Sequence, residues 1–208
     1  MNIEPFKVIL LGENCVGKTS ILIQFIEQTF QDDIYLTTGG LFSIKYAVCD
    51  NNKILKFEIW DTTGREKYHS ISTMYYKDAK AAILVYDITR DNTFEEIKNF
   101  WTKQLKEFCK ENIILIIAGN KSDLIEREET DEEEVRNYAK EINAIFVSTS
   151  AKCNEGINEL FEEIAKKYTG TKNIKMEDSL DQDEYVRNNN NIKINKKEEI
   201  NVKKRGFC

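Results

Sequence analysis

The chain has 208 residues, of which 41% are hydrophobic and 32% are charged, and its formal net charge is −6 at pH 7. This length suits one well-packed domain with a tail, and the acidic balance argues against a nucleic-acid binder that depends on clustered lysine and arginine. The longest apolar runs, residues 81–86 and 113–119, are far shorter than the roughly 20 residues of a membrane-spanning helix. A start without a signal peptide or myristoylation site, and scattered cysteines without metal-site spacing, predict a cytoplasmic protein.

Apolar runs of strand length alternate with amphipathic stretches of helix length up to about residue 168, a pattern typical of an α/β sheet covered by helices. The apolar runs predict six strands, at residues 6–11, 41–49, 53–60, 81–86, 113–119 and 145–148. The amphipathic stretches predict about five helices, at residues 18–28, 66–78, 92–108, 131–141 and 155–168. Only residues 50–52 join the second and third strands, too few for a parallel crossover, so we expect one antiparallel hairpin in a mixed sheet.

The composition changes at about Gly170. The segment beyond it is rich in Asn, Lys and Glu, and it contains four consecutive asparagines at 188–191. It offers too few apolar side chains to form a core. We therefore expect one folded domain at residues 1–169 and a disordered tail at 170–208.

The segment LGENCVGKTS has the spacing of a phosphate-binding loop, between a predicted strand and a predicted helix. Backbone N–H groups at the start of such a helix bind an anion, and Lys18 can reach the β- and γ-phosphates. The hydroxyl of Thr19 suits Mg²⁺, which prefers oxygen ligands. The residues predicted to line the phosphates are Asn14, Cys15, Val16, Gly17, Lys18, Thr19 and Ser20.

Asp61 and Gly64 follow the third predicted strand. A carboxylate at this position can hold Mg²⁺ through a water molecule, and a glycine leaves its N–H free to approach the γ-phosphate. An aspartate after a strand is also common in ordinary turns. The phosphate-binding loop upstream favours the functional interpretation.

Two polar segments after later strands predict a guanine site. The sequence NKSD at 120–123 follows an apolar strand, so it lies at the carboxyl edge of the sheet, where α/β proteins bind ligands. Asp123 can accept hydrogen bonds from guanine N1–H and the 2-amino group, whereas adenine would leave this carboxylate unpaired at a cost of roughly 1–3 kcal/mol. After the next strand, the N–H of Ala151 can donate to guanine O6. The predicted base-binding residues are Asn120, Lys121, Asp123, Ser150, Ala151 and Lys152.

These motifs, in this order, resemble the Ras-like small GTPases and, within them, the Rab family, most closely its early-endosomal, Rab-five-like subgroup. The segments that resemble Rab sequences are TTGGLFSIK at 37–45, KFEIWD at 56–61, KYHSI at 67–71, YYKDA at 75–79 and LVYDIT at 84–89. The resemblance implies a P-loop GTPase fold that binds GTP or GDP with Mg²⁺. It further implies that Thr37 contacts Mg²⁺ and the γ-phosphate, and that Phe30 packs on guanine. It also implies an effector-binding surface formed by Phe42, Trp60 and Tyr75.

The same resemblance implies the partners and the location of the protein. The expected partners are an exchange factor, a GTPase-activating protein, a GDP-dissociation inhibitor or escort protein, and effectors that read the two switches. We expect a monomer that cycles between the cytosol and endosomal or other vesicle membranes, held there by a geranylgeranyl group on Cys208. The tail has neither a CaaX box nor paired cysteines, so an unmodified thiol is the alternative. A single lipid binds only weakly, and Lys203, Lys204 and Arg205 supply a basic patch beside it.

Arg65 stands where the GTPase template has the glutamine that orients the attacking water. Glutamine accepts a hydrogen bond from that water, whereas arginine only donates. We therefore predict slow intrinsic hydrolysis, with Asn14, Cys15 and Thr63 as further departures near the terminal phosphate. Three interpretations stay open: a switch reset by a partner, a scaffold that holds GTP almost permanently, and an enzyme in which Arg65 stabilises developing charge. The residues expected to act in hydrolysis are Lys18, Thr37, Gly64 and Arg65.

Overall fold

The computed structural model describes residues 2–31, 41–50, 53–62, 73–110 and 112–179. The residues up to Asp178 form one compact unit. Several residues singled out by the sequence lie outside the described ranges: Thr37, Thr63, Gly64, Arg65, Lys203, Lys204, Arg205 and Cys208.

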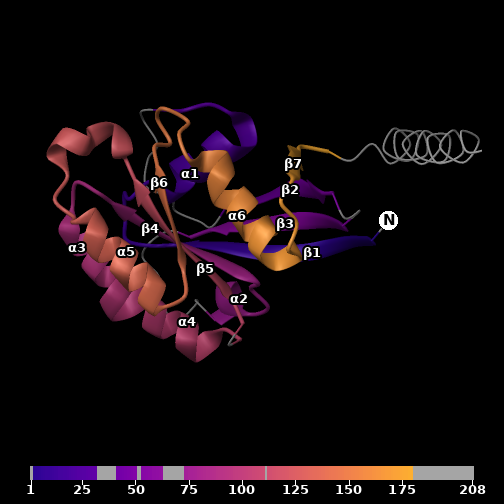
Figure 1. The fold of residues 1–208 in the computed structure, drawn as a ribbon, viewed down its shortest axis with the longest axis horizontal. Helices are drawn as coiled ribbons and strands as arrows, with labels where there is room; N and C mark the ends of the chain where they lie inside the picture. The colour runs from indigo at the N-terminus through magenta and orange to yellow at the C-terminus, as the bar shows by residue number, and fades with distance from the viewer. Residues whose placement is uncertain (1, 32–40, 51–52, 63–72, 111, 180–208) are drawn as a thin grey trace, which may run out of the picture. The chain divides into compact units, whose positions relative to one another are not determined.

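The described residues contain a seven-stranded mixed sheet (Figure 1). In spatial order its strands are β6 (Ile145–Thr149), β5 (Ile114–Asn120), β4 (Ala81–Asp87), β1 (Asn2–Leu11), β3 (Lys53–Asp61), β2 (Phe42–Cys49) and β7 (Ile174–Glu177). The strands from β6 to β3 are parallel, and β2 pairs antiparallel with β3 as the short connection predicts. The parallel strands therefore end at one edge of the sheet, where Asp61, Asp87 and Asn120 are the last residues of their strands.

Strand β7 corrects two predictions, the count of six strands and the start of the tail at residue 170. It pairs antiparallel with β2, from Cys49↔Ile174 to Tyr46↔Glu177. The side chains of Ile174 and Met176 pack against the core. An unpaired edge strand offers free N–H and C=O groups, so even a short polar segment with two apolar side chains can add to it. The predicted domain boundary at residue 169 is therefore too early.

Helices cover both faces of the sheet (Figure 1). On one face lie α1 (Lys18–Glu27) and α6 (Ile157–Thr169). On the other lie α2 (Thr73–Tyr76), α5 (Glu132–Glu141) and an uninterrupted helix made of α3 (Asp91–Glu96), the π-helical η3 (Ile97–Trp101) and α4 (Thr102–Phe108). A 3₁₀ turn, η4 (Ser122–Arg127), follows β5. The helix predicted at 66–78 is described only from residue 73 onward.

Alternation along the strands divides the core into two layers. In β1, Phe6, Val8 and Leu10 face α1 and α6, whereas Ile9 and Leu11 face the helices of the opposite layer. Successive side chains of a strand point to opposite faces, which explains the division. The central strands are buried on both faces and therefore read as continuous apolar runs. Among the helices in the described ranges, none is both long enough and apolar enough to cross a bilayer.

Candidate nucleotide-binding site

The turn between β1 and α1 has a backbone conformation that requires glycine at two positions. Gly12 has φ +144° and Gly17 has φ +95°. A Cβ atom on Gly12 would lie 2.1 Å from the carbonyl oxygen of Val85, and one on Gly17 would lie 2.2 Å from Nδ2 of Asn120. No other residue type fits such close approaches, so the phosphate-loop glycines predicted from spacing are also required by packing.

Lys18 begins α1 and extends its side chain back over this loop. Its Nζ donates to the carbonyl oxygens of Gly12 at 2.8 Å and of Glu13 at 2.9 Å. The residue is only 5% exposed. The ammonium group, the loop N–H groups and the positive end of α1 thus come together, and this combination favours an anion such as phosphate.

Thr19 and Asp61 meet where α1 passes the end of β3. The Thr19 hydroxyl donates to Oδ2 of Asp61 at 2.7 Å, and Asp61 is fully buried. The adjacent Thr62 donates to the carbonyl oxygen of Leu10 at 2.8 Å, which fixes the end of β3 against β1. A hydroxyl and a carboxylate are hard oxygen donors, so this pair fits a magnesium ion.

Asn120 links the three segments predicted to bind nucleotide. It ends β5, and its Nδ2 donates to the carbonyl oxygen of Val16 in the phosphate loop at 2.8 Å. Its Oδ1 accepts from the N–H of Ala151 and from the hydroxyl of Thr149, both at 3.3 Å. The sequence predicts Asn120 as a base-binding residue, and the structure shows that it holds these loops to one another.

Asp123 and Ser150 also lie together. The Ser150 hydroxyl donates to Oδ1 of Asp123 at 2.6 Å and accepts from the N–H of Cys153 at 3.0 Å. Asp123 is exposed, and an ionised carboxylate has about four acceptor positions. The bond from Ser150 therefore orients the carboxylate and leaves it able to accept from further N–H donors.

Asp87, a buried carboxylate at the same edge, is not among the site residues that the sequence motifs predict. Its Oδ2 lies 2.6 Å from Nζ of Lys121 and 3.1 Å from Nε of Arg90. Burial raises the pKa of Asp87, but hydrogen bonds from Lys121 and Thr89 outweigh burial and hold the pKa below its ordinary value. The available signal is its position as the last residue of the apolar strand within LVYDIT, at the carboxyl edge of the sheet.

The remaining predicted site residues differ in their exposure to solvent. Cys15 and Lys152 are exposed, Val16 is buried, and Ser20 is half-buried in the first turns of α1. The buried Oδ1 of Asn14 makes no hydrogen bond within the described ranges. Phe30, predicted to cover guanine, lies just beyond α1 and is 37% exposed.

The three predicted effector-surface aromatics form one continuous group. Ring centroids lie 5.1 Å apart between Phe42 and Trp60, and 6.0 Å apart between Trp60 and Tyr75. Phe42 is 48% exposed, and Nζ of Lys7 lies 4.8 Å from the centre of the Trp60 ring. Residues from β2, β3 and α2 thus meet in one group, as the resemblance to Rab sequences implies.

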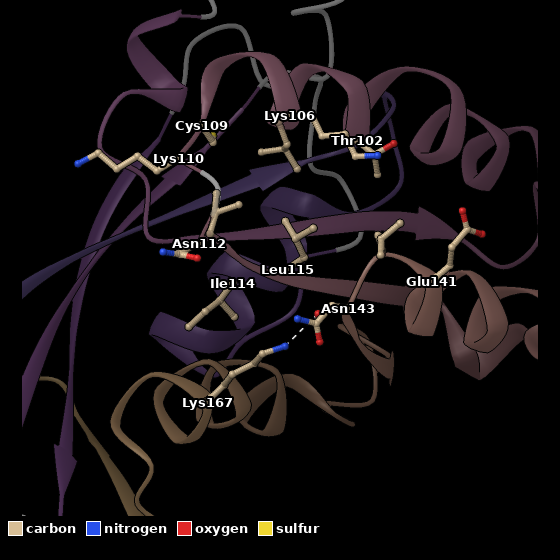
Figure 2. A pocket seen from close by; sticks show the side chains of 13 residues that line it. Thr102, Lys106, Cys109, Lys110, Asn112, Ile114, Leu115, Glu141, Asn143 and Lys167 are labelled. Atoms are coloured by element: carbon tan, nitrogen blue, oxygen red, sulfur yellow. Dashed lines mark hydrogen bonds between the residues drawn. The ribbon is translucent and has the colours of Figure 1, made fainter.

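A separate cavity of about 710 Å³ lies at the other edge of the sheet (Figure 2). It is lined by α4 and the following Cys109, by the first residues of β5, Ile114 and Leu115, and by Asn143 and Lys167. Nζ of Lys167 donates to the carbonyl oxygen of Asn143 at 2.9 Å. Since β5 rises about 3.3 Å per residue, the cavity is roughly 20 Å from the carboxyl end of that strand. It does not belong to the candidate nucleotide site.

Comparisons with known proteins agree with this arrangement. Residues 7–170 match the Ras family. The chain is 46% identical over 171 residues to the human Ras-related protein Rab-22A, an alignment that covers 82% of this chain and 87% of that protein. It is 44% identical over 169 residues to the Ras-related protein Rab-5A of Dictyostelium discoideum, covering 81% of this chain and 83% of that protein.

Proposed function

The chain belongs to the Ras family as a Rab-type GTPase that binds GTP or GDP with Mg²⁺, and we propose that it is an endosomal trafficking switch with slow intrinsic hydrolysis. One observation carries the residue assignments. The phosphate loop, the Thr19–Asp61 pair and the base-reading loops lie at one edge of the sheet, and Asn120 links the phosphate loop to the base-reading loops. That geometry supports one nucleotide spanning all of them.

At the phosphate end, we assign the contacts to the loop from Asn14 to Ser20 and to Lys18. The ammonium of Lys18 would exchange its bonds to loop carbonyls for bonds to phosphate oxygens. Thr19 and Thr37 would hold Mg²⁺ directly, and Asp61 would hold it through water. A magnesium ion held there would supply positive charge that neutralises the phosphate oxygens.

At the base end, Asp123 would accept from guanine N1–H and the 2-amino group, with its carboxylate oriented by Ser150. The N–H of Ala151 would donate to guanine O6. Phe30 would cover the ring, and Lys121 and Lys152 would complete the pocket. Guanine is favoured over adenine because adenine cannot satisfy the carboxylate.

The switch cycle would depend on Thr37 and Gly64, which contact the γ-phosphate and lose that contact on hydrolysis. Arg65 cannot accept a hydrogen bond from the attacking water, so the intrinsic step would be slow and a GTPase-activating protein would be needed for reset. An exchange factor would reload GTP. Effectors would then bind the exposed group formed by Phe42, Trp60 and Tyr75.

Single-turnover GTP hydrolysis tests the assignment of Arg65. We expect Arg65→Gln to raise the intrinsic rate by about tenfold or more, since a water-orienting acceptor is restored. Arg136→Gln, which removes an exposed arginine on α5, is the matched control and should leave the rate unchanged. Equal rates for wild type and Arg65→Gln, or a faster wild type, would rule out the impaired-hydrolysis proposal.

A second candidate is a scaffold that stays bound to GTP almost permanently, and the arginine at position 65 favours it as well. The two candidates differ in the nucleotide that the protein carries in its cell. We propose the switch, and therefore expect protein isolated from its native cell to contain mostly GDP. Recovery of almost pure GTP would favour the scaffold.

Membrane attachment is proposed to use a geranylgeranyl group on Cys208 with the neighbouring basic residues. A GDP-dissociation inhibitor or escort protein would then extract the GDP-bound form, and the protein would act as a monomer on endosomal membranes. We expect the C-terminal peptide of membrane-bound protein to carry the mass of the lipid. Cys208→Ser should move the protein to the soluble fraction, whereas Cys153→Ser, at an exposed cysteine of the domain, should not. Unmodified Cys208 in the membrane fraction would contradict the proposal.

A further inference from the structure

Asp87 gathers contacts from two loops at the carboxyl edge of the sheet. It is 1% exposed, and its Oδ2 lies 2.6 Å from Nζ of Lys121 and 3.1 Å from Nε of Arg90. Its Oδ1 accepts from the N–H and the hydroxyl of Thr89, at 3.0 and 2.7 Å. The bonds to Thr89 stabilise the local turn. Arg90 belongs to the same turn, whereas the bond to Lys121 reaches the loop after β5.

Arg90 continues this arrangement to the phosphate loop. While its Nε stays on Asp87, its Nη2 donates to the carbonyl oxygen of Asn14 at 3.0 Å. A peptide unit is planar and trans, so holding the carbonyl of Asn14 also fixes the direction of the Cys15 N–H. That N–H is one of the donors that the loop offers to phosphate. Cys15 has φ +60°, a strained value for a residue other than glycine, which an outside contact helps to maintain.

Lys121 lies at the other end of the arrangement, in the base-reading loop. It also has a positive φ, +69°, and its side chain is 34% exposed. Bonded to Asp87, the ammonium group is held against the sheet edge. Since Asp123 follows two residues later, the position of Lys121 constrains the segment that carries the guanine acceptor.

We propose that Asp87 and Arg90 form a clasp that holds the base-reading loop and the phosphate loop in register, and that both are positioning residues for retention of guanine nucleotide. The clasp rests on the proposed function, because it assigns roles around that same site. Without the carboxylate, Lys121 and Arg90 become neighbouring cations with no negative charge between them. Each loop then loses one of its anchors, while the bonds of Asn120 remain, and the nucleotide leaves faster.

Dissociation of a fluorescent GDP analogue from the full-length protein, with Mg²⁺ present, measures the clasp. We expect Asp87→Asn to accelerate release by about tenfold or more, the scale of a lost charge-assisted hydrogen bond. Arg90→Gln removes only the phosphate-loop arm and should accelerate release by about fivefold. Arg136→Gln removes an arginine paired with Glu132 at 2.7 Å on the surface of α5 and should leave release unchanged.

A double-mutant cycle separates positioning from general stability. In a Lys121→Ala background, Asp87→Asn should accelerate GDP release less than it does in wild type, by a factor about threefold or more smaller. A carboxylate with only a structural role would produce the same fold-change in both backgrounds, and that result would overturn the inference. If Asp87→Asn does not fold, Arg90→Gln is the variant to test, because the Arg90 side chain is half-exposed. A GDP release rate of Arg90→Gln equal to that of wild type would also overturn the inference.

The two proposals fail in different ways. Wild-type protein that does not retain GDP would contradict the proposed function itself, and the clasp with it. Wild-type protein that retains GDP, while Asp87→Asn and Arg90→Gln release it at the wild-type rate, would overturn only the clasp.

Discussion

Gly12 shows how closely the phosphate loop packs against the neighbouring strand. An added Cβ would meet the backbone oxygen of Val85 at 2.1 Å, and backbone cannot move aside as a flexible side chain can. Gly170 also has a positive φ, +70°, but nothing lies within 4 Å of its added Cβ. The two glycines therefore separate the cost of backbone conformation from the cost of a steric clash.

We predict that Gly170→Ala lowers the free energy of unfolding by about 1 kcal/mol, the cost of the left-handed conformation alone. Gly12→Ala should lower it by at least about 2 kcal/mol, because the clash adds to that cost. Urea unfolding of both variants beside wild type, without nucleotide, measures the difference. Equal losses for the two variants would contradict the packing described for the loop.

Cys109 provides a pH-dependent prediction at the edge of the cavity shown in Figure 2. Burial raises the pKa of this thiol to about 11, whereas an ordinary cysteine has a pKa of about 8.5. The reactive form is the thiolate, so at pH 8 we expect Cys109 to react with iodoacetamide about 100-fold more slowly than a thiol with the ordinary pKa; the exposed Cys153 serves as the comparison within the chain. The gap should narrow as the pH rises toward 11. Mass spectrometry of each peptide measures the two reaction rates. Equal rates at pH 8 would contradict the burial of Cys109.

The same shift has a consequence for stability. Between pH 8.5 and 11 the thiol of Cys109 stays protonated in the folded protein and loses its proton in the unfolded chain. The unfolded chain then binds fewer protons, so the contribution of this group to stability falls as the pH rises through that window.

Among the elements, β7 closes the outer edge of β2. Its inward side chains, Ile174 and Met176, pack against the core, while Asp178 pairs with Lys45 at 3.0 Å. The Lys45 side chain is 5% exposed, and its Nζ also donates to the carbonyl oxygen of Phe25 at 2.6 Å. The strand therefore gains stability from apolar contact and from the neutralisation of a buried cation.

We predict that Met176→Ala lowers the free energy of unfolding by about 1–2 kcal/mol, through loss of partly buried apolar area. Lys175→Ala, one position away on the exposed side of the same strand, should change it by less than about 0.5 kcal/mol. Urea unfolding of the two variants measures both values. Equally small losses for Met176→Ala and Lys175→Ala would contradict the packing described for β7.

The long helix over residues 91–108 illustrates what periodicity reveals about an element. Its position agrees with the stretch predicted at 92–108, because apolar side chains recur at helical spacing. Its π-helical turn, η3, has no counterpart in that pattern. There the Thr102 hydroxyl donates to the carbonyl oxygens of Ile97 and Lys98, at 3.0 and 3.1 Å, and Trp101 is fully buried.

For the whole molecule, the proposed site joins loops from strands that are distant in the sequence. No single loop contains the donors for phosphate, metal and base together. A ligand that binds all of them stabilises the folded chain relative to the unfolded chain by mass action.

We therefore predict that GDP with Mg²⁺, at about 1,000 times its dissociation constant, raises the free energy of unfolding by about 4 kcal/mol. EDTA should reverse part of this gain because it removes the ion that we propose Thr19 and Asp61 hold. ADP at the same concentration should have little effect, since adenine leaves Asp123 unpaired. Thermal melts under the three conditions provide the measurement, and equal shifts with ADP and GDP would contradict the assigned base contacts.

The sequence by itself determined the α/β class, the hairpin, the order of the nucleotide motifs and the resemblance to Rab proteins. These depend on local properties: alternation within a strand, helical spacing within a helix, and polar residues directly after apolar strands. Lys18, Thr19, Asp61 and Asn120 could be assigned to one candidate site in this way because parallel strands end at a common edge.

Only the tertiary structure decided which distant groups meet. Ile174 pairs with Cys49, Arg90 reaches the carbonyl of Asn14, and Asp87 joins Lys121 to Arg90. No local pattern encodes these contacts. A short polar segment becomes a strand only when a free edge lies beside it, and a carboxylate becomes a clasp only when folding buries it between two cations.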